Sequence, residues 1–123
     1  TLVTKSYERT DIESLFRDKQ FFVLVAVFND KIVGAVRYKF IRDNLYLYKL
    51  ATLKAYRNQG IGASLVQAVE KEARKQKAKR VLLDCAREKG LAAFYKRHGF
   101  EIDKIKKHED HHDVYMSKGL KYE

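Results

Sequence analysis

The sequence has no proline, a single cysteine and no apolar run long enough to cross a membrane. Without proline-rich, repeated or low-complexity stretches, nothing marks an internal linker. The lone cysteine, Cys85, cannot form an internal disulfide or a cysteine-based metal site, which suits a reducing compartment. A membrane-spanning helix needs ~20 consecutive apolar residues. The first ten residues also lack the regions of a signal peptide. We therefore expect one domain over residues 1–123, located in the cytoplasm and without membrane association.

Acidic residues are outnumbered by basic ones. The chain has 26 Lys and Arg against 16 Asp and Glu, a formal net charge of +10. Such an excess favours an anionic partner, which can be a nucleic acid, an anionic lipid or a small polyphosphate ligand. Charge alone does not choose among these partners. The densest basic stretch, residues 71–80, is more typical of a solvated helix end than of a nucleic-acid site.

The hydrophobic pattern predicts a mixed set of strands and helices. Capping-box spacing of Thr10 and Glu13 predicts a short helix near residue 10. Residues 21–28, 32–41 and 45–53 read as strands joined by short turns, which favours an antiparallel meander. A helix is expected over about 60–76, followed by a strand at 80–86 that can lie parallel to 45–53. A second helix over about 91–98 should stop at Gly99, before two last strands around the turn "HEDH".

Two of the six glycines stand at the predicted start of the first long helix, in "RNQGIG". A loop that leads into a helix exposes unpaired backbone N–H groups at the positive end of the helix dipole, which attracts phosphate. Gly60 and Gly62 have no side chains to block a pyrophosphate, while Arg57 and Gln59 add hydrogen-bond donors. The motif lacks the three glycines of the dinucleotide fingerprint and the GK[ST] of a P-loop. A helix start that happens to contain glycines is the alternative interpretation.

Two segments together resemble the GNAT N-acetyltransferase superfamily. "YRNQGIGASLV" is similar to the acetyl-CoA signature R/Q-x-x-G-x-G/A, and "GLAAFYKRHGFE" resembles the family's A-x-x-x-Y-x-x-x-G-F segment. The resemblance covers roughly residues 21–120. It implies an α+β fold with a mostly antiparallel, twisted sheet, a splayed pair of parallel strands and flanking helices. The usual opening strand and two helices have only about twenty residues here, so the N-terminal part is expected to be abbreviated.

The resemblance also implies where acetyl-CoA binds. The pantetheine arm would lie between the splayed strands 45–53 and 80–86, and coenzyme A would account for the basic charge. The implied contacts are Leu50, Ala51, Thr52 and Leu53 with pantetheine, Arg57, Asn58, Gln59, Gly60, Ile61, Gly62 and Ala63 with the pyrophosphate, and Leu91, Phe94, Tyr95 and Arg97 from the second segment. Lys96, Arg97 and the basic cluster after Lys71 are candidates for the ribose phosphate.

Amide formation sets three chemical tasks: an amine attacks the thioester, an oxyanion develops and a thiolate leaves. The resemblance assigns the oxyanion contact to the Thr52 N–H and protonation of the sulfur to Tyr95. An ordinary phenol has a pKa of ~10 and is therefore protonated at neutral pH. The alternative role for Tyr95 is packing of its short helix against the sheet.

Other candidates are weaker. Some family members have a glutamate base where this chain has Tyr46, so proton removal through water near Tyr46, Tyr48 or Asp84 stays open, as does entry of a neutral amine. "HEDHHD", residues 108–113, lacks HExxH spacing and falls at a predicted turn, so we expect no metal.

The expected activity is transfer of the acetyl group from acetyl-CoA to a primary amine of a small molecule or a protein, by direct attack in a ternary complex. The rival hypothesis is a non-catalytic basic module that binds acyl-CoA or nucleic acid. Nucleic acid is disfavoured because exposed aromatics do not alternate with basic residues in an RNA-binding pattern. The acceptor, the general base and homodimer formation are left open.

Overall fold

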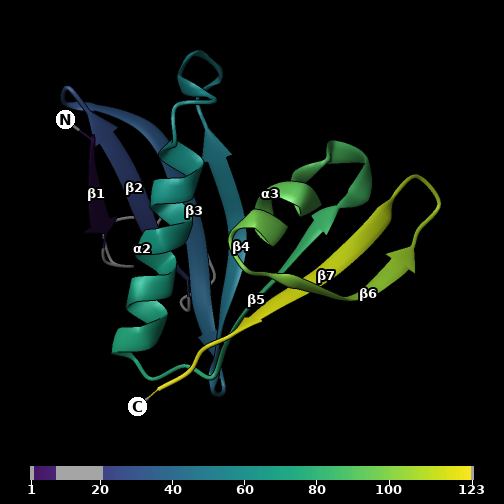
Figure 1. The fold of residues 1–123 in the computed structure, drawn as a ribbon. Coiled ribbons are helices and arrows are strands. Elements are labelled where there is room, and N and C mark those ends of the chain that lie inside the picture. The colour runs from purple at the N-terminus through teal and green to yellow at the C-terminus, as the bar shows by residue number, and fades with distance from the viewer. Residues whose placement is uncertain (1, 8–20, 123) are drawn as a thin grey trace.

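The computed structural model describes residues 2–7 and 21–122, which build one mixed sheet with helices on it (Figure 1). The strands are β1 (Leu2–Tyr7), β2 (Phe22–Phe28), β3 (Lys31–Ile41), β4 (Asn44–Thr52), β5 (Arg80–Ala86), β6 (Glu101–Lys107) and β7 (His112–Gly119). The α-helices are α2 (Ile61–Lys75) and α3 (Leu91–Arg97), and the 3-10 turns are η1 (Lys54–Tyr56) and η2 (Arg87–Lys89). The spatial order of the seven strands is β1-β2-β3-β4-β5-β7-β6.

Most of the predicted elements are present within a residue or two of their expected ends. The meander β2-β3-β4 is antiparallel, and β5 lies parallel to β4 as the intervening helix predicts. The helix predicted near residue 10 lies outside the described residues. The sequence analysis did not predict β1, which pairs antiparallel with β2 from Leu2↔Phe28 to Tyr7↔Val23.

Helix α2 forms because its apolar residues repeat at helical spacing, and its C-terminal end suits the helix dipole. Ile61, Leu65, Val66, Val69 and Ala73 are buried. The first turn contains no acidic residue, and Arg74 and Lys75 lie in the last turn, where cations are favourable. The helix packs on the sheet face formed by β2, β3 and β4 (Figure 1).

The core lies between α2 and this face of the sheet and continues toward β5 and β7. Its most completely buried side chains are Leu45, Leu65, Leu83, Met116, Val33, Val36, Val69, Val81 and Val114. Cys85 is buried on β5, as its strand position predicted. No helix in the described part of the chain combines the length and apolar character needed to span a bilayer.

Candidate active site

The sheet opens between its two parallel strands. β4 and β5 pair only through Asn44↔Arg80, Leu45↔Val81 and Tyr46↔Leu82, although β4 continues to Thr52. Just beyond this junction, the pairing of β4 with β3 skips Tyr48, because Leu47 pairs with Tyr38 and Lys49 pairs with Arg37. Such a bulge bends its strand. The bend therefore accounts for the divergence of β4 from β5, and the predicted splayed pair is present (Figure 1).

Two main-chain positions of β4 face this gap. The Leu53 N–H donates to the Val33 carbonyl at 2.8 Å, and the Leu53 carbonyl accepts from the Tyr56 N–H at 2.9 Å. Successive residues of a strand direct their N–H and C=O groups to opposite edges. Ala51 therefore faces β3 like Leu53, whereas Leu50 and Thr52 present their main-chain groups to the gap. Of the four residues predicted to contact pantetheine, Leu50 and Thr52 are therefore the two whose main-chain groups point toward the gap and not toward β3.

The loop before α2 leads directly from the gap to the helix N-terminus. Gly60 caps the helix with φ +83°, and a Cβ built on it has no neighbour within 4 Å. Asn58 also has a positive φ of 62°. The first intrahelical bond in this turn is Ser64 N–H to the Gly60 carbonyl at 3.0 Å, so the amides of Ile61, Gly62 and Ala63 have no intrahelical acceptor. This geometry provides the anion-attracting helix start that the motif predicted.

Gly62 lies in a more crowded environment than Gly60. A Cβ at Gly62 would lie 3.4 Å from Phe94 Cζ and 4.0 Å from Leu50 Cδ2. These are ordinary van der Waals distances, so Gly62 lies next to the Phe94 ring of α3 and to Leu50 of β4 without being required by that packing. The contact joins predicted cofactor residues from α2, α3 and β4, and Figure 1 shows α3 beside the opening between β4 and β5.

Polar side chains of the loop bind the main chain that precedes them. Arg57 Nε donates to the Thr52 carbonyl at 3.4 Å, and Gln59 Nε2 donates to the Ala55 carbonyl at 3.5 Å. The contact from Arg57 is long, and both side chains are exposed. Leu53 and Leu91 are exposed large apolar side chains, and Lys96 and Arg97 are exposed at the end of α3. Apolar and basic groups therefore both lie open near the gap.

Tyr95 is a buried aromatic whose hydroxyl has no hydrogen-bond partner in the described part of the chain. Only 3 % of the residue is exposed, and its ring lies 5.2 Å from the Phe94 ring and 5.7 Å from the Phe100 ring, measured between centroids. Among the described residues, the only fully buried side-chain polar atom without a partner is His108 Nε2, so the Tyr95 oxygen keeps some access to solvent. Burial, with a smaller contribution from nearby Cys85, raises the pKa of Tyr95.

A second polar pair spans the β4–β5 junction. The Tyr46 hydroxyl donates a hydrogen bond to Asp84 Oδ1. Burial, then this bond and the Asp84 charge, raise the pKa of Tyr46 well above its ordinary value. The Tyr46 and Tyr48 rings are 5.8 Å apart between centroids. The alternation of β4 places Tyr46 on the sheet face opposite buried Leu45 and Leu47, hence opposite α2. The sequence analysis considered Tyr46 and Asp84 separately and did not predict the hydrogen bond between them.

A shallow apolar pocket lies between the start of β3 and the end of β4. Its volume is about 200 Å³, and its lining residues are Ile32, Val33, Gly34, Ala35, Ala51, Thr52 and Leu53. Three of the predicted pantetheine residues, Ala51, Thr52 and Leu53, belong to this lining. The hollow can accept a small apolar group next to the main chain of Thr52.

One cluster in the structure lies in the segment 108–113, for which the sequence analysis considered a metal site and expected none. His108, His111 and Asp113 lie together at the turn between β6 and β7, with one ligand-type atom from each within 4.8 Å of the others. The spacing that could have revealed it is H-x-x-H-x-D across a hairpin turn, since such a turn brings the two histidines face to face.

Comparison with known proteins places this geometry among acetyltransferases. Residues 2–100 match the model of the acetyltransferase (GNAT) family. An uncharacterized N-acetyltransferase of Schizosaccharomyces pombe is 35% identical over 99 residues, which cover 77% of this chain and 67% of that protein.

Solved structures share the fold at lower sequence identity. The ribosomal-protein-S18-alanine N-acetyltransferase from Escherichia coli is 17% identical with a TM-score of 0.84, and the match covers 100% of this chain and 96% of that chain. A GNAT family acetyltransferase from Elizabethkingia anophelis with acetyl-CoA bound is 15% identical with a TM-score of 0.81, covering 97% and 98%. The PaiA N-acetyltransferase from Thermoplasma acidophilum in complex with coenzyme A is 22% identical with a TM-score of 0.75, covering 92% and 67%.

Proposed function

The chain belongs to the acetyltransferase (GNAT) family and is an acetyl-CoA-dependent acetyltransferase, and from this premise we propose that residues 1–123 act as one catalytic domain that acetylates a primary amine. The acceptor is an amine of a small molecule or of a protein. The observation that carries the proposal is the gap between β4 and β5, which opens directly onto the glycine loop at the start of α2. A thioester arm and a pyrophosphate need these two features side by side.

In the proposed complex, the pantetheine arm lies in the gap and hydrogen-bonds to the main chain of Leu50 and Thr52. Both residues direct their N–H and C=O groups toward the gap, as the bonds of Leu53 to its neighbours indicate. Leu53 and Leu91 offer exposed apolar side chains to the methylene groups of the arm. Leu53 contributes through its side chain because its main chain is already engaged.

The pyrophosphate lies over the helix start, where amides from Asn58 to Ala63 converge. Gly60 supports this role because the space that a side chain would take is open. Arg57 can turn its guanidinium from the long contact with the Thr52 carbonyl to a phosphate, which forms stronger charge-assisted bonds. Arg97 and Lys96, which are exposed on α3, are the basic side chains that bind the ribose phosphate in this complex.

The reaction is direct attack of the neutral amine on the thioester carbonyl. A C–N bond forms, the Thr52 N–H hydrogen-bonds to the developing oxyanion, and the C–S bond then breaks. Tyr95 donates its proton to the departing sulfur, while the proton from the amine passes to water or to a base. The raised pKa of Tyr95 keeps the hydroxyl protonated, as a general acid requires. Its lack of a hydrogen-bond partner among the described residues leaves the donor free for the sulfur.

The amine approaches from the opposite side of the gap, past Tyr46 and Asp84. The Asp84 carboxylate is partly buried on β5, next to the point where the strands separate. A carboxylate at this position attracts an ammonium group and accepts its proton through Tyr46 or a bound water. The surrounding tyrosine rings favour a cationic or amphipathic amine, since cations bind well over aromatic faces.

A matched pair of variants at Gly60 tests the cofactor site. Gly60→Asp and Gly60→Asn both place a side chain of the same size at φ +83°, a conformation that Asp and Asn tolerate, but only aspartate brings a negative charge. Gly60→Asp should abolish calorimetric binding of acetyl-CoA and acetyl transfer in a screen of amine acceptors, while Gly60→Asn retains more of both. Equal affinity of the two variants and the parent would mean that the pyrophosphate binds elsewhere. Binding of acetyl-CoA by the parent without turnover of any amine would favour the non-catalytic module.

A further inference from the structure

The turn between β6 and β7 gathers histidines on one face of a hairpin. Three of the four histidines of the chain fall within residues 108–113. The His108 N–H donates to the His111 carbonyl at 2.8 Å, and the register next to this turn pairs Lys107 with His112 and Lys106 with Asp113. Cross-strand partners share a face and successive residues alternate. His108, His111 and Asp113 therefore share one face, and His112 lies on the other.

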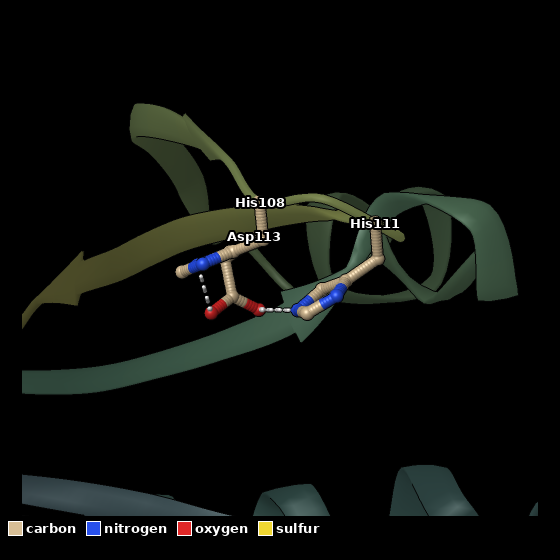
Figure 2. Close-up of side chains that lie close together, drawn as sticks. All are labelled: His108, His111 and Asp113. Atoms are coloured by element: carbon tan, nitrogen blue, oxygen red, sulfur yellow. Dashed lines mark ion pairs between the residues drawn. The ribbon is translucent and has the colours of Figure 1, made fainter.

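The side chains of these three residues lie close to one another. Figure 2 shows the Asp113 carboxylate between the two imidazoles. Asp113 Oδ2 is 3.5 Å from His108 Nε2, and Asp113 Oδ1 is 3.9 Å from His111 Nε2. A tetrahedral zinc ion with nitrogen and oxygen ligands at ~2.0–2.2 Å separates those ligands from one another by ~3.4 Å. The two measured distances end on different oxygens of Asp113, and a set of one ligand atom from each residue spans up to 4.8 Å, so binding of an ion would draw the three groups closer together to reach that spacing.

Two further observations point to a ligand for this cluster. His108 Nε2 is buried and is the only such side-chain atom among the described residues that makes no hydrogen bond, since its 3.5 Å contact with Asp113 Oδ2 is an ion pair only if the ring is protonated. His111 Nδ1 lies 2.6 Å from Asp110 Oδ1. A carboxylate that holds one ring nitrogen fixes the tautomer and directs the lone pair of the other nitrogen outward, as in many metal-binding histidines. For His111, that other nitrogen is Nε2, which faces Asp113.

We propose that His108, His111 and Asp113 bind a divalent transition-metal ion, for which zinc is the natural probe. Two imidazoles and one carboxylate suit zinc and related ions, with water as a fourth ligand. The histidine side chains are each 37% exposed and Asp113 is 20% exposed, so an ion and its water can enter. The site does not need HExxH spacing, because a hairpin turn brings the ligands together as one helical turn would.

The bound ion would have a structural role. Asp113 pairs with Ala86 at the end of β5, and the His112 N–H donates to Glu88 Oε1 of η2 at 2.7 Å. The hairpin tip is thus already attached to the end of β5 from its other face. A metal ion bound by His108, His111 and Asp113 would add a second contact that stabilises the hairpin tip. This structural role would not depend on acetyl transfer.

The test uses tag-free protein, because a histidine tag would bind the probe. Calorimetric titration of the parent with zinc chloride should give one saturable site per chain, and cobalt(II) should give the visible absorption of a bound, low-coordinate ion. His108→Ala and Asp113→Asn should each lose zinc affinity by more than the ~10–100-fold that removal of a supporting residue costs. The loss of zinc affinity in Asp110→Asn should lie within that ~10–100-fold range, because Asp110 supports a ligand and is not one itself.

His112→Ala is the matched control, since it removes an imidazole from the same turn but from the opposite face. It should keep the parent's zinc affinity and cobalt spectrum, and far-UV circular dichroism should confirm that every variant is folded. No saturable zinc binding by the parent would mean that the cluster is an ion-pair network only, which overturns the proposal. Equal loss in His112→Ala and His108→Ala would overturn the ligand assignment.

Discussion

Replacement of Tyr95 by phenylalanine separates the two roles of this residue, packing and proton donation. The tyrosine ring packs against Phe94 and Phe100, and a phenylalanine ring in the same place would keep those contacts. The hydroxyl has no hydrogen-bond partner among the described residues, so the usual ~0.5–1.5 kcal/mol for a lost hydrogen bond does not apply. We therefore expect the free energy of unfolding of Tyr95→Phe to lie within about 1 kcal/mol of the parent value.

The chemical step should change far more than the stability. General acid catalysis is worth ~100- to 10,000-fold, which corresponds to ~2.7–5.5 kcal/mol in the activation barrier at about 1.36 kcal/mol per factor of ten. The assay is single-turnover acetyl transfer at saturating acetyl-CoA, since steady-state turnover can be limited by product release. Urea unfolding and calorimetric binding of acetyl-CoA should be almost unchanged in the same variant.

Tyr122→Phe is the matched control because it removes a hydroxyl from a tyrosine that is 43% exposed near the C-terminus and binds the Ala78 carbonyl, outside the proposed acetyl-CoA and acceptor contacts. Its single-turnover rate should stay within a few-fold of the parent rate. If Tyr95→Phe transferred acetyl groups as fast as the parent, Tyr95 would be a packing residue and another group would protonate the sulfur. A fall in acetyl-CoA affinity that matched the fall in rate would also contradict the reasoning, because the hydroxyl would then act in binding.

Four further measurements test other parts of the molecule. Because burial raises the pKa of Tyr95, its acid form persists as pH rises, so single-turnover rates should show no loss from this group below about pH 10; an alkaline fall at lower pH that disappears in Tyr95→Phe would contradict this. Coenzyme A at ~100 times its dissociation constant should add about 2.7 kcal/mol to stability and raise the melting temperature, and an unchanged melt would argue against binding in the gap. Asp84→Asn should lower the rate with amine acceptors while acetyl-CoA affinity is retained; an unchanged rate would remove Asp84 from the acceptor site. Gly34→Ala places a Cβ 2.9 Å from Ile61 Cγ2 and 3.1 Å from the Ala51 carbonyl oxygen, so urea unfolding should show a loss of about 1–3 kcal/mol, against almost none for Gly119→Ala, whose added Cβ meets nothing within 4 Å.

The sequence predicted those parts of the fold that depend on local patterns. The helix expected over 60–76 is α2 at Ile61–Lys75, because glycine at its start and apolar residues at helical spacing act locally. Gly99 follows α3 with φ +90°, the conformation expected of a glycine after a helix. The strand predicted at 80–86 is β5 with the same bounds. In each case a run of neighbouring residues contains the information.

Features that depend on distant residues could not be predicted in the same way. β1 is a strand because Leu2–Tyr7 pairs with β2, and no local signal in that segment required it. The surroundings of Gly62 also emerge only from the fold: the sequence analysis predicted access for a phosphate, and the structure adds that the Phe94 ring of α3 lies next to this glycine. The Tyr46–Asp84 hydrogen bond joins residues 38 positions apart, and only the β4–β5 register brings them together.

The short junction between β4 and β5 divides the sheet mechanically into two half-sheets, β1 to β4 on one side and β5, β7 and β6 on the other. Backbone pairing joins the halves at one end only, through three residue pairs, so their free ends can part or approach without breaking a ladder bond. A ligand in the gap would take the place of the missing hydrogen bonds between β4 and β5. Its thickness would then set the angle between the two half-sheets. Such an angle would be transmitted to α2, which packs mainly on β2, β3 and β4, and to α3, which contacts β5, and the width of the acceptor entrance would then depend on what occupies the gap.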